Sequence, residues 1–281
     1  MQRKLDKEIN LIVGKNGNLA GAVTRNIQDC QSIGREIFSS WGEESGTIEI
    51  EKYFATLDKR VVSVFNCAGI TNTKSDPILI KKINLDLPKN LLSFCSERDI
   101  PVITFGSVME NFQQYSETNN YLKSKIALRN WLVDNFSASN LSLHIQMHTL
   151  YGGARNQPHM FLGQIFEALK NNSGFQMSAG NQIREYHHID DDMAALQVIT
   201  SRCKSGIHSI SHGLPIRLND LATHIFSSFG KEDLLSVGKL ESSSFENQDV
   251  VFMVDIDLTQ VEFRDTKAGV VNWMKEALGE S

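Results

Sequence analysis

The feature that most constrains the fold is a glycine-rich turn between an apolar run and an amphipathic stretch. The apolar run covers residues 9–13, the turn begins at Gly14, and the amphipathic stretch covers residues 18–27. A short apolar run bounded by glycine is typical of a buried strand, and apolar residues three to four positions apart are typical of a helix. The start of the chain is therefore predicted to form a strand, a tight turn and a helix.

The same alternation continues through the first half of the chain. Further strands are predicted at residues 36–38, 61–65, 101–105 and 141–147, and helices at residues 48–57, 79–96 and 121–136. Strands that alternate with helices need crossover connections, which make the sheet parallel and cover both of its faces. Residues 1–150 are expected to form an α/β domain, a doubly wound (Rossmann) parallel sheet.

The second half of the chain lacks this regular alternation of strands and helices. Gly152 and Gly153 open a polar loop, and helices are predicted at residues 161–169, 191–201, 218–229 and 268–278, with irregular connections and only short strands between them. Residues 151–281 are therefore expected to form mostly a smaller, mixed C-terminal lobe that binds the substrate and is interleaved with the sheet.

Composition excludes several classes of partner. The 281 residues carry a net charge of -5 and no long block of Lys or Arg, which argues against a nucleic-acid partner. No signal peptide is evident, and no stretch approaches the roughly 20 apolar residues that span a bilayer, so we expect no membrane partner and a cytoplasmic location. The four cysteines lack CxxC spacing and predict neither a zinc site nor a disulfide framework.

The glycine turn has the pattern of a dinucleotide-binding site. It has the sequence GKNGNLAG from Gly14 to Gly21. Glycines permit a tight turn and a close approach to a pyrophosphate, and the N-terminus of the following helix favours an anion. The expected cofactor contacts are Gly14, Asn16, Gly17, Asn18 and Leu19. A turn that binds nothing is the alternative.

The choice between the two nicotinamide cofactors depends on the end of the second strand. An acidic residue there would bind the ribose 2′-hydroxyl of NAD, but Ser39 and Ser40 stand at the end of the expected strand, and Ser39 is predicted to contact the cofactor. Arg35 is a candidate for a 2′-phosphate, whereas Glu43 and Glu44 favour NAD if their loop folds back. The expected cofactor is therefore NADP(H), slightly favoured over NAD(H).

A catalytic constellation is predicted around Tyr121 and Lys125, which lie one helical turn apart. The pKa of tyrosine is about 10 in water, so a neighbouring positive charge is needed to stabilise the phenolate, and Lys125 and the nicotinamide can supply it. Ser107 ends the preceding strand, at the sheet edge where ligands bind. We expect Ser107, Tyr121 and Lys125 to be catalytic, with Tyr121 as proton donor. An ordinary surface helix is the alternative.

These motifs together resemble the short-chain dehydrogenase/reductase superfamily. The glycine turn, the segment Asn66-Cys67-Ala68-Gly69, Ser107 and the YLKSK sequence that starts at Tyr121 occur in the order that the superfamily shows. The resemblance implies that Ala68, Gly69 and Ile70 contact the cofactor, as do Tyr121 and Lys125.

The second half is similar to the extended branch, the NAD-dependent epimerase/dehydratase family. The segment His148-Thr149-Leu150-Tyr151-Gly152 is similar to its NVYG segment, and REYHHIDD, from Arg184, is similar to its RDF–VDD segment. The resemblance implies a nucleotide-sugar substrate, bound by Ser107, Thr149 and Arg184, and a cofactor contact from His148. An Arg184 paired on the surface with Glu185 or Asp190 is the alternative.

No metal site is expected. The adjacent residues His187 and His188 invite a metal hypothesis, but neighbouring residues on an extended segment face opposite sides, and no third ligand stands at a useful spacing. Both histidines are expected to be structural.

The predicted activity depends on the residues that directly follow Ser107. Val108 and Met109 stand where 4,6-dehydratases carry an acidic pair, and the cysteine of the epimerase-reductases is absent. The chain most resembles the nucleotide-sugar 4-ketoreductases, the dTDP-4-dehydrorhamnose reductases among them. This resemblance implies reduction of a nucleotide-linked 4-keto-6-deoxysugar. The alternatives are an NAD-dependent nucleotide-sugar 4-epimerase and a non-catalytic nucleotide-binding member, and a homodimer is left open.

Overall fold

A computed structural model describes residues 7–115, 119–135, 141–154, 157–203, 205–241 and 249–280. The chain divides into two compact units, one of Met1–Met147 with Leu196–Ser209 and the other of His148–Ala195 with Ile210–Ser281. Each unit has its own cluster of buried apolar side chains. Among the described residues, every helix is too short or too polar to cross a membrane.

The first unit is built on a six-stranded parallel sheet. Its strand order is β10-β5-β4-β3-β1-β2, and all neighbours pair in parallel. The strands are β1 (Glu8–Val13), β2 (Cys30–Ile33), β3 (Arg60–Asn66), β4 (Val102–Ser107), β5 (Ser142–Met147) and β10 (Gly206–Ser209). This sheet confirms the predicted α/β fold class.

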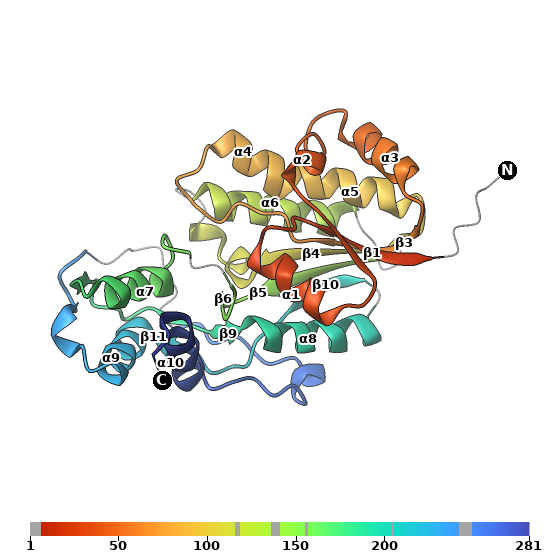
Figure 1. The fold of residues 1–281 in the computed structure, drawn as a ribbon. Helices are drawn as coiled ribbons and strands as arrows, with labels where there is room; N and C mark the ends of the chain where they lie inside the picture. Colours follow the sequence, from red (N-terminus) through yellow and green to blue (C-terminus); the bar gives the residue numbers. More distant parts are fainter. Residues whose placement is uncertain are drawn as a thin grey trace. The chain divides into compact units, whose positions relative to one another are not determined.

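Helices cover both faces of this sheet, as the crossover rule requires. Figure 1 shows α3, α4, α5 and α6 on one face, and α1 and α8 on the other. Their bounds are α1 (Asn18–Asn26), α3 (Gly46–Thr56), α4 (Pro77–Lys81), α5 (Leu87–Ser96), α6 (Asn120–Asn135) and α8 (Ile189–Arg202), which enters this unit at Leu196. The predicted helices of the first half are thereby confirmed.

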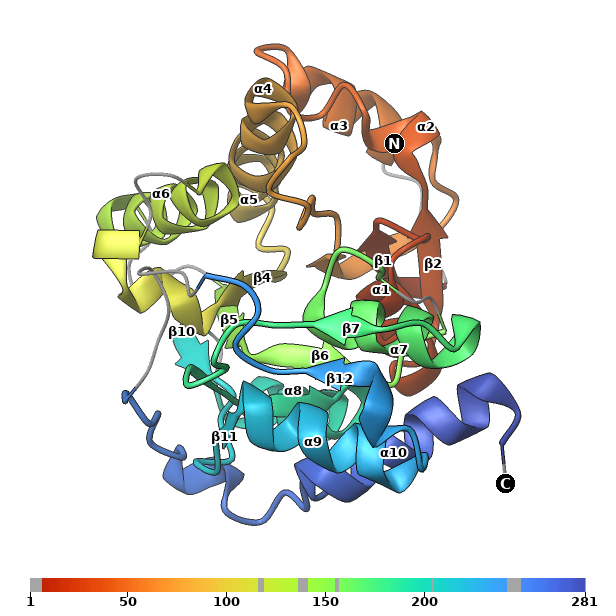
Figure 2. The ribbon, with the colours of Figure 1, turned by 90° about the vertical axis from the view of Figure 1, so that its left-hand side faces the viewer.

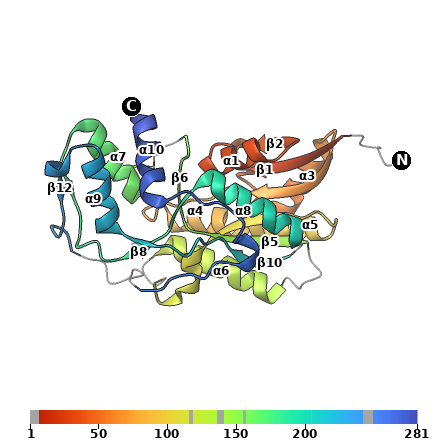
Figure 3. The same cartoon turned by 90° about the horizontal axis from the view of Figure 1, so that it is seen from below.

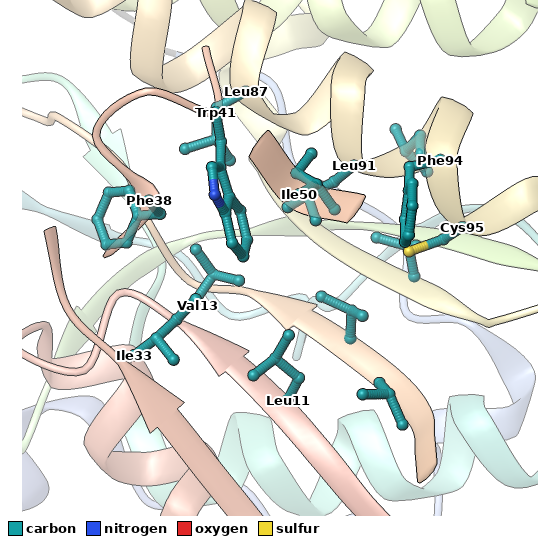
Figure 4. Close-up of a cluster of buried hydrophobic side chains, with 14 of the residues drawn as sticks. Leu11, Val13, Ile33, Phe38, Trp41, Ile50, Leu87, Leu91, Phe94 and Cys95 are labelled. Carbon is teal, nitrogen blue, oxygen red and sulfur yellow. The ribbon is translucent and has the colours of Figure 1, made fainter. Parts of the chain in front are cut away.

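The core of the first unit lies between the sheet and α5. Figure 4 shows Leu11 and Val13 of β1 directed towards Leu87 and Leu91 of α5, with the Trp41 ring among them. All five side chains are almost fully buried. Burying one large apolar side chain contributes about 1.5–3 kcal/mol, so this layer holds the sheet and the helix together.

The second strand is not where the sequence pattern put it. Residues 36–38 were expected to form this strand, but β2 is Cys30–Ile33, and α2 (Arg35–Phe38) follows it. An edge strand needs few apolar residues, and only Ile33 of β2 is buried, so an apolar-run criterion misses it. Ser39 therefore follows a helix, and the expectation that it ends a strand is wrong.

The helix expected at residues 79–96 contains a π-helical turn. The turn, η1 (Lys82–Asp86), lies between α4 and α5 without a break. A π-turn inserts one residue into the helical repeat, and such turns are frequent at functional sites. The residues before and after it therefore face directions that an uninterrupted α-helix would not give.

The second unit is smaller and mixed. Three short strand pairs occur: β6 (Thr149–Tyr151) with β9 (Tyr186–His188) in parallel, β8 (Ile183–Arg184) with β11 (Ile216–Arg217) antiparallel, and β7 (Phe175–Gln176) with β12 (Leu235–Ser236) in parallel. Its helices are α7 (Phe161–Asn171), α9 (Leu218–Ser228), α10 (Thr266–Leu278) and the first half of α8. Figure 2 shows α9 beside α10, and Figure 3 shows both in one group with α7.

Irregular connections separate these elements. They include the 3₁₀-helices η4 (Glu232–Leu234) and η5 (Ile256–Leu258), whereas η2 (Val108–Asn111) and η3 (Gln113–Tyr115) follow β4 in the first unit. The predicted helices of the second half are confirmed within a few residues at each end.

The glycine turn gives a prediction about stability. Gly14 has a φ of +107°, and a Cβ there would lie 2.8 Å from the backbone nitrogen of Ala68. We expect Gly14→Ala to lower the free energy of unfolding by about 1–3 kcal/mol, measured by urea denaturation. The control is Gly230→Ala, where φ is +60° but no described atom lies within 4 Å of the added Cβ. Equal losses in the two variants would show that close packing at Gly14 is unimportant.

Candidate functional site

The site begins at the point where the strand order reverses. The chain passes from β1 to β2 on one side and then returns to place β3 on the other side of β1. In open α/β sheets, ligands bind at the carboxyl ends of the strands at such a point. The glycine turn follows β1 there, and the segment from Asn66 to Gly69 follows β3. The two cofactor motifs of the sequence therefore meet at the predicted position.

Backbone hydrogen bonds fix the shape of the glycine turn. The N–H groups of Gly14 and Lys15 both donate to the carbonyl of Ile33, at 3.0 and 2.9 Å, and the N–H of Gly17 donates to the carbonyl of Gly14 at 3.0 Å. Gly17 is the N-cap residue of α1 and has no side chain to occupy the N-terminus of that helix. A helix N-terminus of this kind binds phosphate oxygens, so the turn fits the pyrophosphate of a dinucleotide.

The end of β2 presents one cation and one ion pair. Arg35 is exposed and stands two residues after Ile33, the last residue of β2. Next to it, the Glu36 carboxylate pairs with Lys15 Nζ at 2.6 Å. Because Lys15 is also bound to Ile33 through its backbone, this end of β2 is tied to the glycine turn. Arg35 thus occupies the region where an acidic residue would select NAD.

Asn84, in the π-helical turn, forms hydrogen bonds that hold the segment after β3, which is predicted to contact the cofactor. Its Oδ1 accepts from the N–H of Ile70 at 2.8 Å, and its Nδ2 donates to the carbonyl of Ile70 at 2.9 Å and to Ser124 Oγ at 3.1 Å. The side chain therefore joins the segment after β3 to α6, the helix of Tyr121 and Lys125. Asn84 is not among the residues predicted from the sequence, although a polar residue inside an apolar helical pattern was the available signal.

The three predicted catalytic residues lie together. Ser107 ends β4, and its side chain lies close enough to Tyr121 to act on the pKa of the phenol. Lys125 Nζ lies 5.9 Å from the centre of the Tyr121 ring and donates to the carbonyl of Phe105 at 2.6 Å. The strand end and the helix thus bring a hydroxyl, a phenol and an ammonium group into one place, as predicted. Their catalytic role stays a prediction.

A buried carboxylate that the sequence analysis overlooked holds Ser107 in position. Glu110 Oε1 accepts from the N–H of Ser107 at 2.7 Å, and Ser107 Oγ accepts from the N–H of Met109 at 3.2 Å, which together make a capping box around η2. Glu110 Oε2 lies 2.9 Å from His144 Nε2 and accepts from Gln146 Nε2 at 3.1 Å. The spacing Ser-x-x-Glu directly after a strand was the signal for this box.

The register of β4 and β5 explains how this polar network forms. Thr104 pairs with His144 and Gly106 pairs with Gln146, so these alternate positions share one face of the sheet. Thr104 Oγ1 lies 2.8 Å from His144 Nδ1 and continues the network. A Cβ on Gly106 would lie 2.3 Å from His144 Nε2 and 2.4 Å from Glu110 Oε1, so only glycine leaves room for this pair.

Burial and the charge of Glu110 set the electrostatics of the site. Burial raises the pKa of Tyr121, the Glu110 carboxylate raises it further, and the hydrogen bond with Ser107 acts in the opposite direction. Burial lowers the pKa of Lys125, and Glu110 opposes that shift. Burial alone would raise the pKa of Glu110, but the hydrogen bond with His144 and the charges of His144 and Lys125 bring it below its ordinary value.

The pKa of Tyr121 rises because burial and Glu110 dominate. The phenol is therefore protonated at neutral pH. Stabilisation of the phenolate by Lys125 together with the positive charge of the nicotinamide stays a prediction.

The remaining predicted contacts lie in the second unit. His148 precedes β6, its side chain is only 5 % exposed, and its Nε2 lies 3.6 Å from Glu185 Oε1. The N–H of Thr149 donates to the carbonyl of Glu185 at 3.3 Å. Arg184 is half-buried and donates from Nη1 to the carbonyl of Ile183 at 3.2 Å. Their contacts with cofactor or substrate stay predictions.

The two adjacent histidines face opposite sides, as expected. The His187 ring stacks on that of His212, with centres 4.5 Å apart, and the His188 ring contacts Tyr151 at 5.3 Å. No third ligand stands at a useful spacing in the sequence, but in the structure ligand atoms of His148, Glu185 and His187 all lie within 4.8 Å of one another. These residues approach through strand pairing, which sequence spacing does not show.

Comparison with known structures gives the same fold. The chain is similar to dTDP-4-dehydrorhamnose reductase from Bacillus anthracis str. Ames in complex with NADP, with a TM-score of 0.74 and 15 % identity over 96 % of this chain and 99 % of that one. It is also similar to MoeE5 in complex with UDP-glucose and NAD, with a TM-score of 0.72 and 15 % identity over 96 % and 99 % of the two chains.

A third similar structure is the UDP-N-acetylglucosamine 4-epimerase from Methanobrevibacter ruminantium M1 in complex with UDP-N-acetylmuramic acid. Its TM-score is 0.71, and the identity is 14 % over 97 % of each chain. At such identities the likeness establishes the fold alone. A search of curated proteins found no match.

The family assignment comes from the sequence match. The model of the NAD dependent epimerase/dehydratase family matches residues 19–211, which is more than half of the chain. The match starts at Leu19, near the end of the glycine turn, and includes the segment after β3, Ser107, Tyr121, Lys125 and Arg184. The geometry of the glycine turn fits the nicotinamide dinucleotide that this family name implies. The chain therefore belongs to the NAD dependent epimerase/dehydratase family and is an NAD(P)-dependent enzyme of the short-chain dehydrogenase/reductase type.

Proposed function

We propose that the protein reduces the keto group of a nucleotide-linked 4-keto-6-deoxysugar, with Tyr121 as the proton donor. The observation that carries this proposal is the grouping of Ser107, Tyr121 and Lys125, in which burial and Glu110 raise the pKa of Tyr121. A proton donor must hold its proton until charge develops on the substrate oxygen. The raised pKa supports this role because it keeps the phenol protonated at neutral pH.

Each residue of the group has a defined task in this reaction. When bound, the nicotinamide dinucleotide supplies the hydride. Ser107, fixed by its capping box, donates a hydrogen bond to the substrate carbonyl oxygen and polarises it. Tyr121 gives its proton to that oxygen, and the nearby Lys125 ammonium stabilises the phenolate that remains. The carbonyl of Phe105 holds the ammonium in place.

The alternatives to reduction make different demands on the same residues. A 4-epimerase begins by oxidising its substrate, which needs a Tyr121 phenolate as base, and the raised pKa of Tyr121 disfavours that starting state. A non-catalytic member does not need Ser107, Tyr121 and Lys125 to lie together. The grouping of these three side chains supports an enzyme that uses them.

The substrate and the cofactor are inferred from cationic residues. The guanidinium of Arg184 is suited to the oxygens of a nucleoside diphosphate, and Thr149 offers a hydroxyl to the sugar. Arg35, beyond the end of β2, is suited to the 2′-phosphate of NADP(H), which we propose as the preferred cofactor. The exposed position of Arg35 beside the Lys15–Glu36 pair supports this choice.

The reaction itself can be tested with a panel of nucleotide-4-keto-6-deoxysugars and either NADPH or NADH. We expect stoichiometric loss of the absorbance of the reduced cofactor with one of these sugars. Tyr121→Phe should still bind NADPH, measured by fluorescence, but turn over about 10²–10⁴-fold more slowly. The matched control is Tyr53→Phe in α3, which should keep full activity. Isomerisation without net use of cofactor would instead identify an epimerase.

The carboxylate of Glu110 should control the pH dependence. Glu110 raises the pKa values of Tyr121 and Lys125, so Glu110→Gln lowers both, while the amide oxygen can still accept from Ser107. Reduction needs protonated Tyr121 and is lost as pH rises through its pKa. The alkaline limb of kcat/KM should therefore move to lower pH in Glu110→Gln and stay in place in the control Glu97→Gln. An unmoved limb in Glu110→Gln would exclude this electrostatic role.

Cofactor preference can be tested at Arg35. Loss of a charge-assisted contact with a phosphate costs about 1.5–3 kcal/mol, so Arg35→Ala should raise KM for NADPH about 10–100-fold. KM for NADH should not change, and the exposed control Arg202→Ala should alter neither value. An equal effect on both cofactors would disprove 2′-phosphate recognition by Arg35.

A further inference from the structure

The pairing of β6 with β9 gathers three metal-ligating side chains on one face. In the parallel register Thr149 pairs with Tyr186, which places His148 beside Glu185, one residue earlier on each strand. Residues two apart on an extended segment share a face, so His187 lies on the same side as Glu185. The cluster is therefore a product of strand register in the second unit.

The spacing of the ligand atoms suits one small cation. His148 Nε2 lies 3.6 Å from Glu185 Oε1, and His187 Nε2 lies 3.1 Å from Glu185 Oε2. Ligand atoms bound tetrahedrally to zinc at about 2.0–2.2 Å stand about 3.3–3.6 Å apart. Each carboxylate oxygen of Glu185 therefore faces one of the two imidazoles, and the three groups together lie within 4.8 Å of one another.

Neighbouring groups orient these side chains as they do around bound metals. His187 Nδ1 lies 2.6 Å from Asp192 Oδ1, so the far nitrogen of the imidazole is held by a fully buried carboxylate. A histidine that binds a metal usually has its other nitrogen held in this way. Glu185 is held in turn by Ser211 Oγ, at 2.8 Å from Oε1, and by the N–H of His212, at 2.8 Å from Oε2.

An independent observation comes from His148. Its Nε2 is buried, and among the described residues it has no hydrogen-bond partner. A buried nitrogen without a partner costs about 1–3 kcal/mol. The nitrogen is directed towards Glu185, where a cation shared with the carboxylate would satisfy its lone pair. The contacts of His187 with the carboxylates of Glu185 and Asp192 do not supply a hydrogen-bond partner for His148 Nε2.

We propose that His148, Glu185 and His187 bind a divalent first-row transition metal, for which zinc is the best chemical match. Two imidazoles and a carboxylate are a zinc donor set, whereas magnesium prefers oxygen ligands and keeps several waters. The three side chains are at most 5 % exposed, so a metal held there would be shielded from solvent, with a fourth position left for water. The metal would cross-link the start of β6 to β9, and His148 would then be a metal ligand and not the cofactor contact that the resemblance implies.

Zinc binding to the intact protein tests this site. The protein is stripped with EDTA, given ZnCl₂ or MgCl₂, desalted, and its metal content measured by mass spectrometry. We expect about one equivalent of zinc and no magnesium, and a melting temperature higher by about 5 °C or more with zinc. Added Co²⁺ should give the visible absorption of a tetrahedral site in the wild-type protein.

Matched variants locate the metal. His148→Gln and Glu185→Gln should lose this equivalent of zinc and the gain in melting temperature, and the control His208→Gln, in the first unit, should keep both. Circular dichroism shows whether each variant is folded. If a variant is not folded, the cobalt spectrum of the wild-type protein tests the metal site instead. No zinc in the wild-type protein, or equal zinc in all variants, would overturn the proposal and leave an ion-paired network.

Discussion

The contact between two backbone segments at the strand reversal is the constraint on which the nucleotide site depends. Gly14 approaches Ala68 so closely that no side chain fits between them. This approach brings the turn after β1 against the segment after β3, and the bonds of Gly14 and Lys15 to Ile33 add the end of β2. The carboxyl ends of β1, β2 and β3 thus form one surface because Gly14 permits this close approach.

The candidate catalytic residues Ser107, Tyr121 and Lys125 depend on one buried carboxylate, that of Glu110. A buried carboxylate is costly unless it is paired and hydrogen-bonded, and Glu110 meets both conditions through Ser107, His144 and Gln146. The same charge acts on Tyr121 and Lys125, so the residue that fixes Ser107 also biases the protonation of its neighbours. Position and proton affinity are therefore coupled through one side chain.

The sequence predicted the residues whose chemistry depends on short spacing. The glycine turn and the pair Tyr121 and Lys125 are defined by offsets of a few positions, so their patterns were visible without a structure. Ser107 was found because it ends a strongly apolar strand. The edge strand β2 was missed because an edge strand carries few apolar residues. The position of Ser39 was wrong for the same reason.

The remaining residues were hidden because strand register and helical phase bring them together. His144 reaches Glu110 only because β5 pairs with β4 in one register, and His148 reaches Glu185 only because β6 pairs with β9. A slip of one residue would turn such side chains to the opposite face. A linear pattern contains no information of this kind.

The π-helical turn has a consequence for how the length of this chain can vary. A π-turn uses one more residue than an α-turn for about the same rotation, so removing one residue from Lys82–Asp86 would restore regular winding and leave α4 and α5 in nearly the same phase. Leu87 and Leu91 would then stay in the core, but the wide turn that carries Asn84 would be lost. A change of length there therefore acts on the contacts of Asn84 with Ile70 and Ser124 and not on the packing of the helix.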